Sequence, residues 1–197
     1  MAIRSTLRAK RMIRPRAVDL ARARAVLAAD GVLAYPTESC FGLGCDPRRP
    51  AAIKRIFSLK RRSRAKGLIL IAAEIKQIAP FVAPAALEDL RRFEPFWPGP
   101  FTLLLPASRM VHPWLRGRHQ QIAVRITNHP WAAGLCKALG TALVSTSANL
   151  SGKISLKTAA ECRQVFGRRA LVVSGRIGFA RRPSTIIDAA TGKILRA

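Results

Sequence analysis

Apolar residues recur at helical spacing in five separate segments of the chain, and several of these segments end at a glycine. Ile53, Ile56 and Phe57 belong to one such stripe, and Gly140 directly follows another. A stripe of this kind predicts a helix with one face on a core, and a glycine past its end is a common stop. The helices that we predict cover residues 17–29, 51–60, 84–92, 130–139 and 158–166.

Short apolar runs without helical spacing lie between these helices and predict β-strands. The run 68–72 is apolar at every position, as expected for a strand covered on both faces. The strands that we predict cover residues 32–35, 68–72, 101–105, 122–126, 142–145, 171–173, 186–188 and 193–195. Strands alternating with helices indicate an α/β sheet, and a terminal hairpin around Gly192 indicates that the sheet is mixed.

The composition supports one globular domain with a large excess of positive charge. The chain has 197 residues, of which 49% are hydrophobic. No apolar run approaches the roughly 20 residues that span a bilayer, so we expect no membrane association. There are 35 Lys and Arg against 10 Asp and Glu, a net charge of +25, which favours polyanionic partners such as nucleotides and RNA. A codon bias in a GC-rich genome is an alternative source of part of this excess.

The first 16 residues contain six basic residues and no acidic one: Arg4, Arg8, Lys10, Arg11, Arg14 and Arg16. No apolar segment follows, which argues against a secretory signal, whereas an Arg-rich transit peptide stays compatible with the composition. We expect a flexible basic arm over residues 1–16, followed by one folded domain over residues 17–197.

Cysteine and histidine residues give no indication of a metal site. The four cysteines form no C-x-x-C pair, and the three histidines show no metal-ligand spacing. Free thiols are the expectation in a reducing cytoplasm, which is where we place the protein. The Walker A and G-x-G-x-x-G motifs are absent. Hydroxyl, Lys and Arg side chains near glycine-bearing loops remain, and they suit anion binding and charge stabilisation better than covalent catalysis.

Four segments carry the most specific signals. The apolar run 141–144 leads into STSANLSGK at 145–153, a loop whose hydroxyl and amide donors suit a phosphate or a carboxylate. The others are YPTESCFGLGCDP at 35–47, KRRSRAKG at 60–67 and PSTIID at 183–188. Each alone is compatible with an ordinary turn or a solvated basic loop. With WPGPFT at 97–102 and AVRI at 123–126 between them, they form a specific set.

In order and spacing these segments resemble the YrdC family over residues 17–197, most closely its short bacterial threonylcarbamoyl-AMP synthases. The resemblance implies a single-domain α/β fold with a twisted, open, mixed sheet, flanking helices and a concave basic face. It also implies that L-threonine and bicarbonate (or CO2) form an N-carboxylated amino acid, which attacks the α-phosphate of ATP to give threonylcarbamoyl-adenylate and diphosphate. That product serves N6-threonylcarbamoyladenosine formation at position 37 of tRNAs that read A-starting codons.

The basic segment after the second predicted helix would then hold the triphosphate. By the resemblance, Lys60 and Arg62 contact the phosphates, and Lys66 reaches the reacting carboxylate or phosphate. These three are the predicted catalytic residues, and we expect them on a polar loop. Ser63 stands where family members commonly have proline, which predicts a looser loop or an additional phosphate contact.

The resemblance divides the remaining polar residues between nucleotide and amino acid. Ser145, Ser147 and Asn149 would bind ATP together with Lys60 and Arg62. The residues predicted to bind L-threonine are Thr37, Lys66, Arg125, Ser145 and Ser184. An arginine such as Arg125 within an apolar strand would be costly if unpaired, so we expect a buried anion beside it.

ATP is expected as a substrate, with Mg²⁺ carried by the nucleotide and no metal bound by the protein itself. The other expected partners are L-threonine, bicarbonate or CO2, tRNA (directly or indirectly), and separate proteins that transfer the threonylcarbamoyl group. The alternative function is an RNA-binding protein with this fold and no adenylation activity, although no RNP or KH motif is present. A carbamoyl-transferring domain of the hydrogenase-maturation type shares the fold, but that class has zinc-binding cysteine motifs and longer chains.

Overall fold

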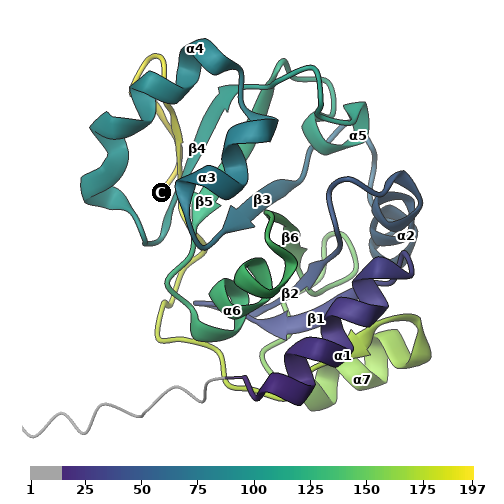
Figure 1. Cartoon of the computed structure of the whole chain (residues 1–197). Coiled ribbons are helices and arrows are strands. Elements are labelled where there is room, and N and C mark those ends of the chain that lie inside the picture. The colour runs from purple at the N-terminus through teal and green to yellow at the C-terminus, as the bar shows by residue number, and fades with distance from the viewer. Residues whose placement is uncertain (1–14) are drawn as a thin grey trace, which may run out of the picture.

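The computed structural model describes residues 15–197, apart from the side chains of Asp89 and Arg91. The predicted arm over residues 1–16 therefore lies almost entirely outside the described residues, and its flexibility stays a prediction. Figure 1 shows the sheet with its surrounding helices. The described α-helices are α1 (Ala17–Ala28), α2 (Pro50–Lys60), α3 (Ile75–Ile78), α4 (Pro84–Leu87), α5 (Pro113–Arg116), α6 (Pro130–Leu139) and α7 (Ala159–Phe166).

Strands of the described chain form one mixed sheet in the order β7-β1-β2-β6-β3-β5-β4-β8-β9. Their bounds are β1 (Leu33–Pro36), β2 (Phe41–Gly44), β3 (Ile69–Ala72), β4 (Phe101–Pro106), β5 (Gln121–Ile126), β6 (Leu143–Ser147), β7 (Leu171–Val172), β8 (Thr185–Asp188) and β9 (Ile194–Arg196). β1 and β7, β3 and β5, and β4 and β8 are parallel pairs, while the other neighbours are antiparallel. The predicted open, mixed α/β sheet is confirmed.

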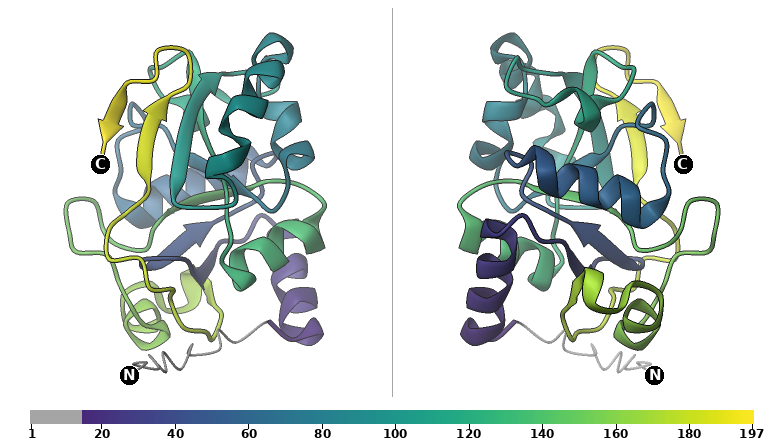
Figure 2. Two further views of the ribbon diagram at one scale, coloured as in Figure 1. Left: turned by 90° about the vertical axis from the view of Figure 1, so that its left-hand side faces the viewer. Right: turned by 90° about the vertical axis from the view of Figure 1, so that its right-hand side faces the viewer.

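Helices lie on both sides of the sheet. α1, α3 and α6 are on one side, whereas α7 and the loop between β6 and α7 are on the other (Figures 1 and 2). The core between these layers is apolar and includes the fully buried Phe41, Leu70 and Phe166. The side of the sheet that carries the β6–α7 loop is also the side on which the site described below opens, because Ser155 of that loop lines it.

Three sequence predictions need correction. Residues 41–44 form β2, although Gly42 and Gly44 made this segment resemble a turn; buried neighbours outweigh the weak strand preference of glycine here. β6 extends to Ser147, so the first hydroxyl residues after the apolar run belong to the strand and not to a loop. The predicted helix 84–92 is α-helical only to Leu87 and continues in 3-10 turns as η2 (Glu88–Phe96), which contain Pro95.

Candidate active site

The strand register brings small and polar residues together on one face of the sheet. Gly42 of β2 pairs with Ser147 of β6, and Ser145 of β6 pairs with Ile69 of β3. The next strand, β5, contributes Arg125, which pairs with β3 two residues after Ile69. Residues two apart along a strand share a face, so four adjacent strands present these side chains to the same space.

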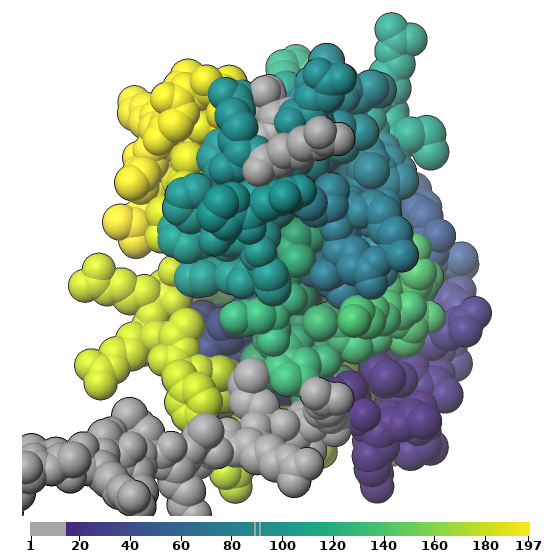
Figure 3. All heavy atoms as spheres, turned by 60° about the vertical axis from the view of Figure 1, so that its left-hand side comes forward, coloured from purple at the N-terminus to yellow at the C-terminus, as the bar shows by residue number. Residues whose placement is uncertain are grey.

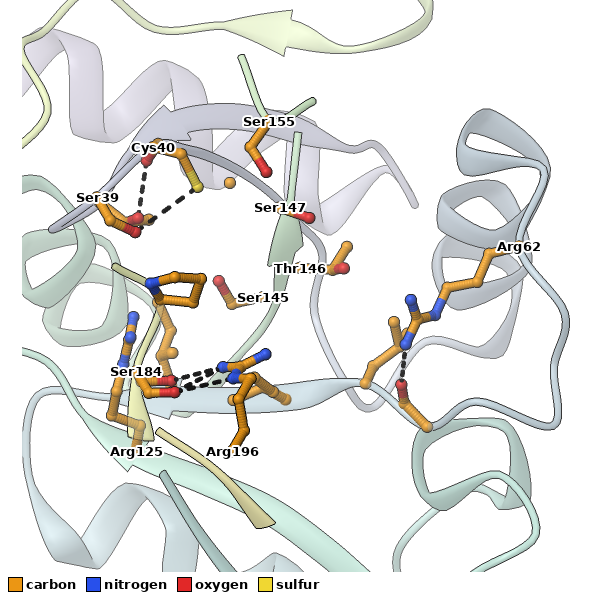
Figure 4. A pocket seen from close by; sticks show the side chains of 17 residues that line it. Ser39, Cys40, Arg62, Arg125, Ser145, Thr146, Ser147, Ser155, Ser184 and Arg196 are labelled. Atoms are coloured by element: carbon orange, nitrogen blue, oxygen red, sulfur yellow. Dashed lines mark hydrogen bonds between the residues drawn. The ribbon is translucent and has the colours of Figure 1, made fainter. Parts of the chain in front are cut away.

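This face forms the floor of a pocket of about 210 Å³ (Figure 4). The predicted site residues that line it are Thr37, Arg62, Arg125, Ser145, Ser147 and Ser184. The lining residues that were not predicted as site residues are Ser39, Cys40, Gly42, Gly67, Leu68, Ile69, Ile71, Thr146, Ser155, Pro183 and Arg196. Among the described residues, three guanidinium groups and no carboxylate line the pocket, which makes it suited to anions.

The cations occupy two ends of this pocket. Figure 4 shows Arg125 and Arg196 together beside Ser184, with Arg62 apart from them. Hydroxyl side chains of β6 lie between the two ends. A ligand with two separate anionic groups would match this arrangement better than a single small anion.

Arg125 has a buried partner, as its position in an apolar strand predicted. Its Nη2 donates to Oε2 of Glu38 over 3.0 Å, and Thr127 Oγ1 donates to the other carboxylate oxygen over 2.5 Å. The Arg125 side chain is 11% exposed and that of Glu38 is also 11% exposed, so both charges are largely removed from water. Arg125 Nε is buried without a hydrogen-bond partner. Glu38 was not predicted from the sequence. It accepts one Nη2 hydrogen of Arg125, and because Arg125 lines the pocket, its remaining guanidinium hydrogens can serve a ligand.

Two hydroxyl groups of the pocket are oriented by short hydrogen bonds. Thr37 Oγ1 donates to the backbone oxygen of Cys40 over 2.8 Å, and the Tyr35 hydroxyl donates to Ser145 Oγ over 2.9 Å. Complete burial raises the pKa of Tyr35 far above its usual value, so Tyr35 stays a neutral donor. Each serine or threonine oxygen retains acceptor capacity toward the pocket.

The third predicted hydroxyl, Ser184, is held by the last strand of the protein. Arg196 Nη2 donates to Ser184 O over 2.7 Å and to Ser184 Oγ over 3.2 Å. Ser184 Oγ also lies 2.7 Å from Thr102 Oγ1. Burial and the nearby charge of Arg125 lower the pKa of Arg196, which remains a cation. Arg196 could not be found from the sequence because its position depends on the pairing of β9 with β8.

The loop between β7 and β8 crosses the segment that carries Thr37. Gly178 N donates to Thr37 O over 2.9 Å, and Ala180 N donates to Glu38 O over 3.0 Å. A Cβ atom at Gly178 would come within 2.8 Å of Glu38 O, so this close approach requires glycine. Side chains of this loop, coloured yellow-green, project from the surface in Figure 3.

Lys60 is not on the polar loop where it was expected, and it is buried. It is the last residue of α2 and is 1% exposed. Its Nζ donates to Ser147 O and to both Asn149 O (2.9 Å) and Asn149 Oδ1 (2.7 Å). Burial lowers the pKa of Lys60 to about 8. Lys60 therefore holds the end of β6 and the following turn in place, and neither Lys60 nor Asn149 lines the pocket.

Arg62 and Lys66 also separate in the structure. Arg62 lines the pocket and is tethered through Nη2 to Gly67 O over 2.9 Å, and burial lowers the pKa of its guanidinium. Lys66 is exposed and is not among the lining residues. The loop that connects α2 to β3 thus presents one of its two predicted cations to the pocket.

The described residues contain no group of three or more His, Cys, Asp or Glu side chains that could hold a metal ion. The four cysteines, Cys40, Cys45, Cys136 and Cys162, are free thiols. Within the described part of the chain, no helix has both the length and the apolar character needed to cross a membrane.

Comparisons with known proteins found both curated relatives and solved structures that are similar to this chain. A threonylcarbamoyl-AMP synthase of Thiobacillus denitrificans is 56% identical over 173 residues, which cover 88% of this chain and 92% of that protein. The solved structure of Sua5 from P. abyssi complexed with L-threonine has a TM-score of 0.80 and 30% sequence identity. The match covers 89% of this chain but only 52% of that Sua5 chain, so this chain spans about half of its length.

A second solved structure, that of E. coli YciO, supports the same fold over nearly the whole of both proteins. It has a TM-score of 0.80 at 24% identity, with 94% of this chain and 91% of YciO covered. The family model named Sua5/YciO/YrdC, described as "Telomere recombination", matches residues 25–197. The fold, the pocket and these matches together place this chain in the Sua5/YciO/YrdC family.

Proposed function

We propose that this chain is a threonylcarbamoyl-AMP synthase, which converts L-threonine, bicarbonate or CO2, and ATP into L-threonylcarbamoyladenylate and diphosphate. The observation that carries the proposal is a pocket with guanidinium groups at two ends and hydroxyl groups between them. The threonylcarbamoyl-AMP synthase of T. denitrificans, 56% identical, supports the same activity. Both substrates of the adenylation step are anionic, so they require cations more than they require an acid or a base.

The reaction itself demands little covalent chemistry from the protein. The carboxylate of N-carboxy-threonine forms a new bond to the α-phosphorus of ATP, and the bond from that phosphorus to the bridging oxygen of diphosphate breaks. The attacking carboxylate already carries its electron pair and needs no general base. Catalysis then consists of positioning the two anions and stabilising the charge that moves onto diphosphate.

We assign Arg62 to the triphosphate, because it lies in the pocket apart from the other two guanidinium groups. Lys60 acts beside it by holding Ser147 at the end of β6 and Asn149 in the following turn, and its charge adds to the field at the phosphates. Lys66 is exposed and directly precedes Gly67, which lines the pocket, and we propose that its long side chain reaches the bound ligand from there.

At the opposite end we assign the threonine carboxylate to Arg125, which lines the pocket and has guanidinium hydrogens beyond the one that it gives to Glu38. Ser184 lies at this end, and Thr37 and Ser145 also line the pocket, so we assign their three hydroxyl groups to the amino acid. Arg196 lies in the same part of the pocket and provides further positive charge there.

We propose that Mg²⁺ enters with the nucleotide. The described pocket lining contains no carboxylate, so phosphate oxygens and water would be its ligands in this proposal. The product then requires tRNA and separate transfer proteins, as the sequence predicted, and we place the reaction in the cytoplasm. We further propose that the basic arm 1–16 contacts tRNA, since it carries six positive charges and no acidic residue.

The decisive experiment supplies ATP, L-threonine and bicarbonate and measures diphosphate release. Release that requires all three substrates supports the synthase. Diphosphate release that does not depend on L-threonine would contradict the synthase, and so would the absence of release from folded protein. Either result would leave the RNA-binding alternative, which needs no adenylation. The arm is tested separately with protein that begins after Arg16: tRNA affinity should fall while diphosphate release stays, and unchanged tRNA affinity would remove the arm from the proposal.

A further inference from the structure

A second basic surface lies away from the substrate pocket, between α1, α2 and the segment from α7 to β7. Two hollows of about 550 Å³ and 500 Å³ adjoin there, because both are lined by Arg55, Arg168 and Arg169. Figures 1 and 2 show α1, α2 and α7 gathered in this part of the molecule. We call this surface the arginine groove, and its basic residues are Arg22, Lys54, Arg55, Arg163, Arg168 and Arg169.

The positive charge of the arginine groove is not neutralised by the described part of the protein. All six basic side chains are exposed. The ion pairs found among the described residues are Arg16–Asp19, Arg48–Asp46, Arg49–Asp30, Lys76–Glu74 and Arg125–Glu38, so none involves the groove. Arg55 donates to Asp30 O, and Arg169 donates to Val165 O and Phe166 O, which orients two guanidinium groups without cancelling their charge.

We propose that the arginine groove binds the phosphate backbone of tRNA. A nucleic acid strand offers a row of phosphates at regular spacing, and binding several of them releases condensed counterions. Five of the six groove cations are arginines, whose planar guanidinium groups can bind a phosphate through two hydrogen bonds. The proposal rests on the tRNA partnership suggested above but not on the adenylation chemistry.

Other polyanions fit the arginine groove less well. An anionic membrane is usually bound by basic residues together with exposed apolar side chains. The large exposed apolar residues of the described chain are Val18, Phe96, Met110, Ile154, Phe179, Ile194 and Leu195, and none of them lines the groove. A free nucleotide would gain from stacking, and no aromatic side chain lines the groove either.

The groove and the substrate pocket can be tested independently, because they share no lining residue. We would replace Lys54, Arg163 and Arg168 together by glutamine in the full-length protein. The control replaces Arg109, Lys137 and Lys193, three exposed cations that line neither the groove nor the pocket. Both variants lose three positive charges, so the comparison separates position from net charge.

The measurement is binding of fluorescently labelled tRNA at several salt concentrations. We expect the groove variant to bind at least tenfold more weakly and to reduce the salt slope by about two to three, as for the loss of three phosphate contacts. The control should bind within about threefold of the unaltered protein. Equal weakening in both variants would mean that net charge alone attracts tRNA, and unchanged binding in the groove variant would remove the site; either result overturns the proposal.

Thermal unfolding of each variant verifies that it is folded, and the exposed single change Arg168→Glu repeats the test if the triple variant is not. Diphosphate release by the unaltered protein is measured in parallel. Failure of that assay would overturn the proposed function and leave the tRNA comparison valid, whereas failure of the tRNA comparison would leave the synthase assignment valid.

Discussion

The substrate pocket and the arginine groove both collect cations, but they hold them in different ways. In the pocket, Arg125 is paired with Glu38, Arg62 is tethered to a backbone oxygen, and Arg196 donates to Ser184. In the groove, the six side chains are exposed and, within the described chain, have no ion-pair partner. Fixed cations suit a small substrate whose charge must be met at defined points, and exposed cations suit a long polyanion whose binding tolerates many arrangements.

The largest effect should follow from releasing a pocket cation. Glu38→Ala leaves the buried Arg125 without its carboxylate, and breaking a buried pair from one side costs about 3–5 kcal/mol of unfolding free energy. The control is Glu74→Ala, which breaks the exposed pair with Lys76 and should change the unfolding free energy much less, because water screens that pair. Urea denaturation of both variants measures the difference. Similar small losses would show that the tethering of Arg125 does not matter for the fold.

Lys60 and Arg62 should both be needed for activity, but only Lys60 should also be needed for stability. Lys60→Ala and Arg62→Ala should each lower diphosphate release by roughly a hundredfold or more, the usual effect of losing a positioned charge. Only Lys60→Ala should also lower the unfolding free energy, by about 1–3 kcal/mol, because it removes the Nζ donor from the partly buried Ser147 O, Asn149 O and Asn149 Oδ1, of which Oδ1 also accepts from Ser147 Oγ.

The exposed Lys137 gives the control for this pair, since it lines neither basic region, and Lys137→Ala should keep both activity and stability. Diphosphate release and denaturation curves, measured on Lys60→Ala, Arg62→Ala and Lys137→Ala, test both the activity and the stability prediction. If Arg62→Ala retained near-native activity, the assignment of the triphosphate to this end of the pocket would be wrong.

The sequence predicted several residues that line the pocket but few of the contacts that hold those residues in place. Thr37, Arg125 and Ser184 were found because each belongs to a motif that resembles the family, and the strands that carry them follow from local apolar runs. Lys60 was placed on a loop because the basic segment follows a predicted helix and precedes a predicted strand. Helical spacing would have predicted its burial, since Lys60 is three residues beyond Phe57 and so falls on the buried face of α2.

Glu38 and Arg196 could not be assigned in this way. Their roles arise from contacts between segments that are far apart in the chain, namely Glu38 with β5 and Arg196 with the Ser184 segment. Local periodicity carries no information about such pairings. Nor does it indicate the arginine groove, because Arg22, Lys54 and Arg168 meet only when α1, α2 and η3 (Gly167–Arg169) are packed together.

A smaller effect should appear when the amino acid is changed. A pocket shaped around L-threonine should prefer it over L-serine by about 1–3 kcal/mol, because the extra methyl group is buried in one case only. The groove, by contrast, has no means to make such a distinction. Competition at matched concentrations below saturation, read as diphosphate release, measures the preference. Equal rates with both amino acids would exclude a fitted threonine site between Thr37, Arg125 and Ser184.

The smallest effect concerns pH, and it separates a buried lysine from a neighbouring arginine. The pKa of Lys60 is lowered from 10.5 to about 8 by burial, so its charge is lost within an accessible range, whereas Arg62 stays protonated. For the free enzyme, kcat/KM should therefore fall by up to about tenfold per pH unit above pH 8. Bound phosphates favour the charged lysine, so the fall in kcat should begin at higher pH.

The unfolding free energy should rise over the pH range in which activity falls. The unfolded chain keeps a lysine pKa near 10.5, so between pH 8 and 10.5 it binds more protons at Lys60 than the folded protein does. The contribution of Lys60 to the unfolding free energy therefore rises with pH in that window, while activity falls. Lys60→Arg, which stays charged, is the matched control and should show neither trend. If the pH profiles of activity and stability are parallel for the lysine and arginine proteins, Lys60 does not titrate in this range. Another group, or the substrates, would then cause the fall in activity at high pH.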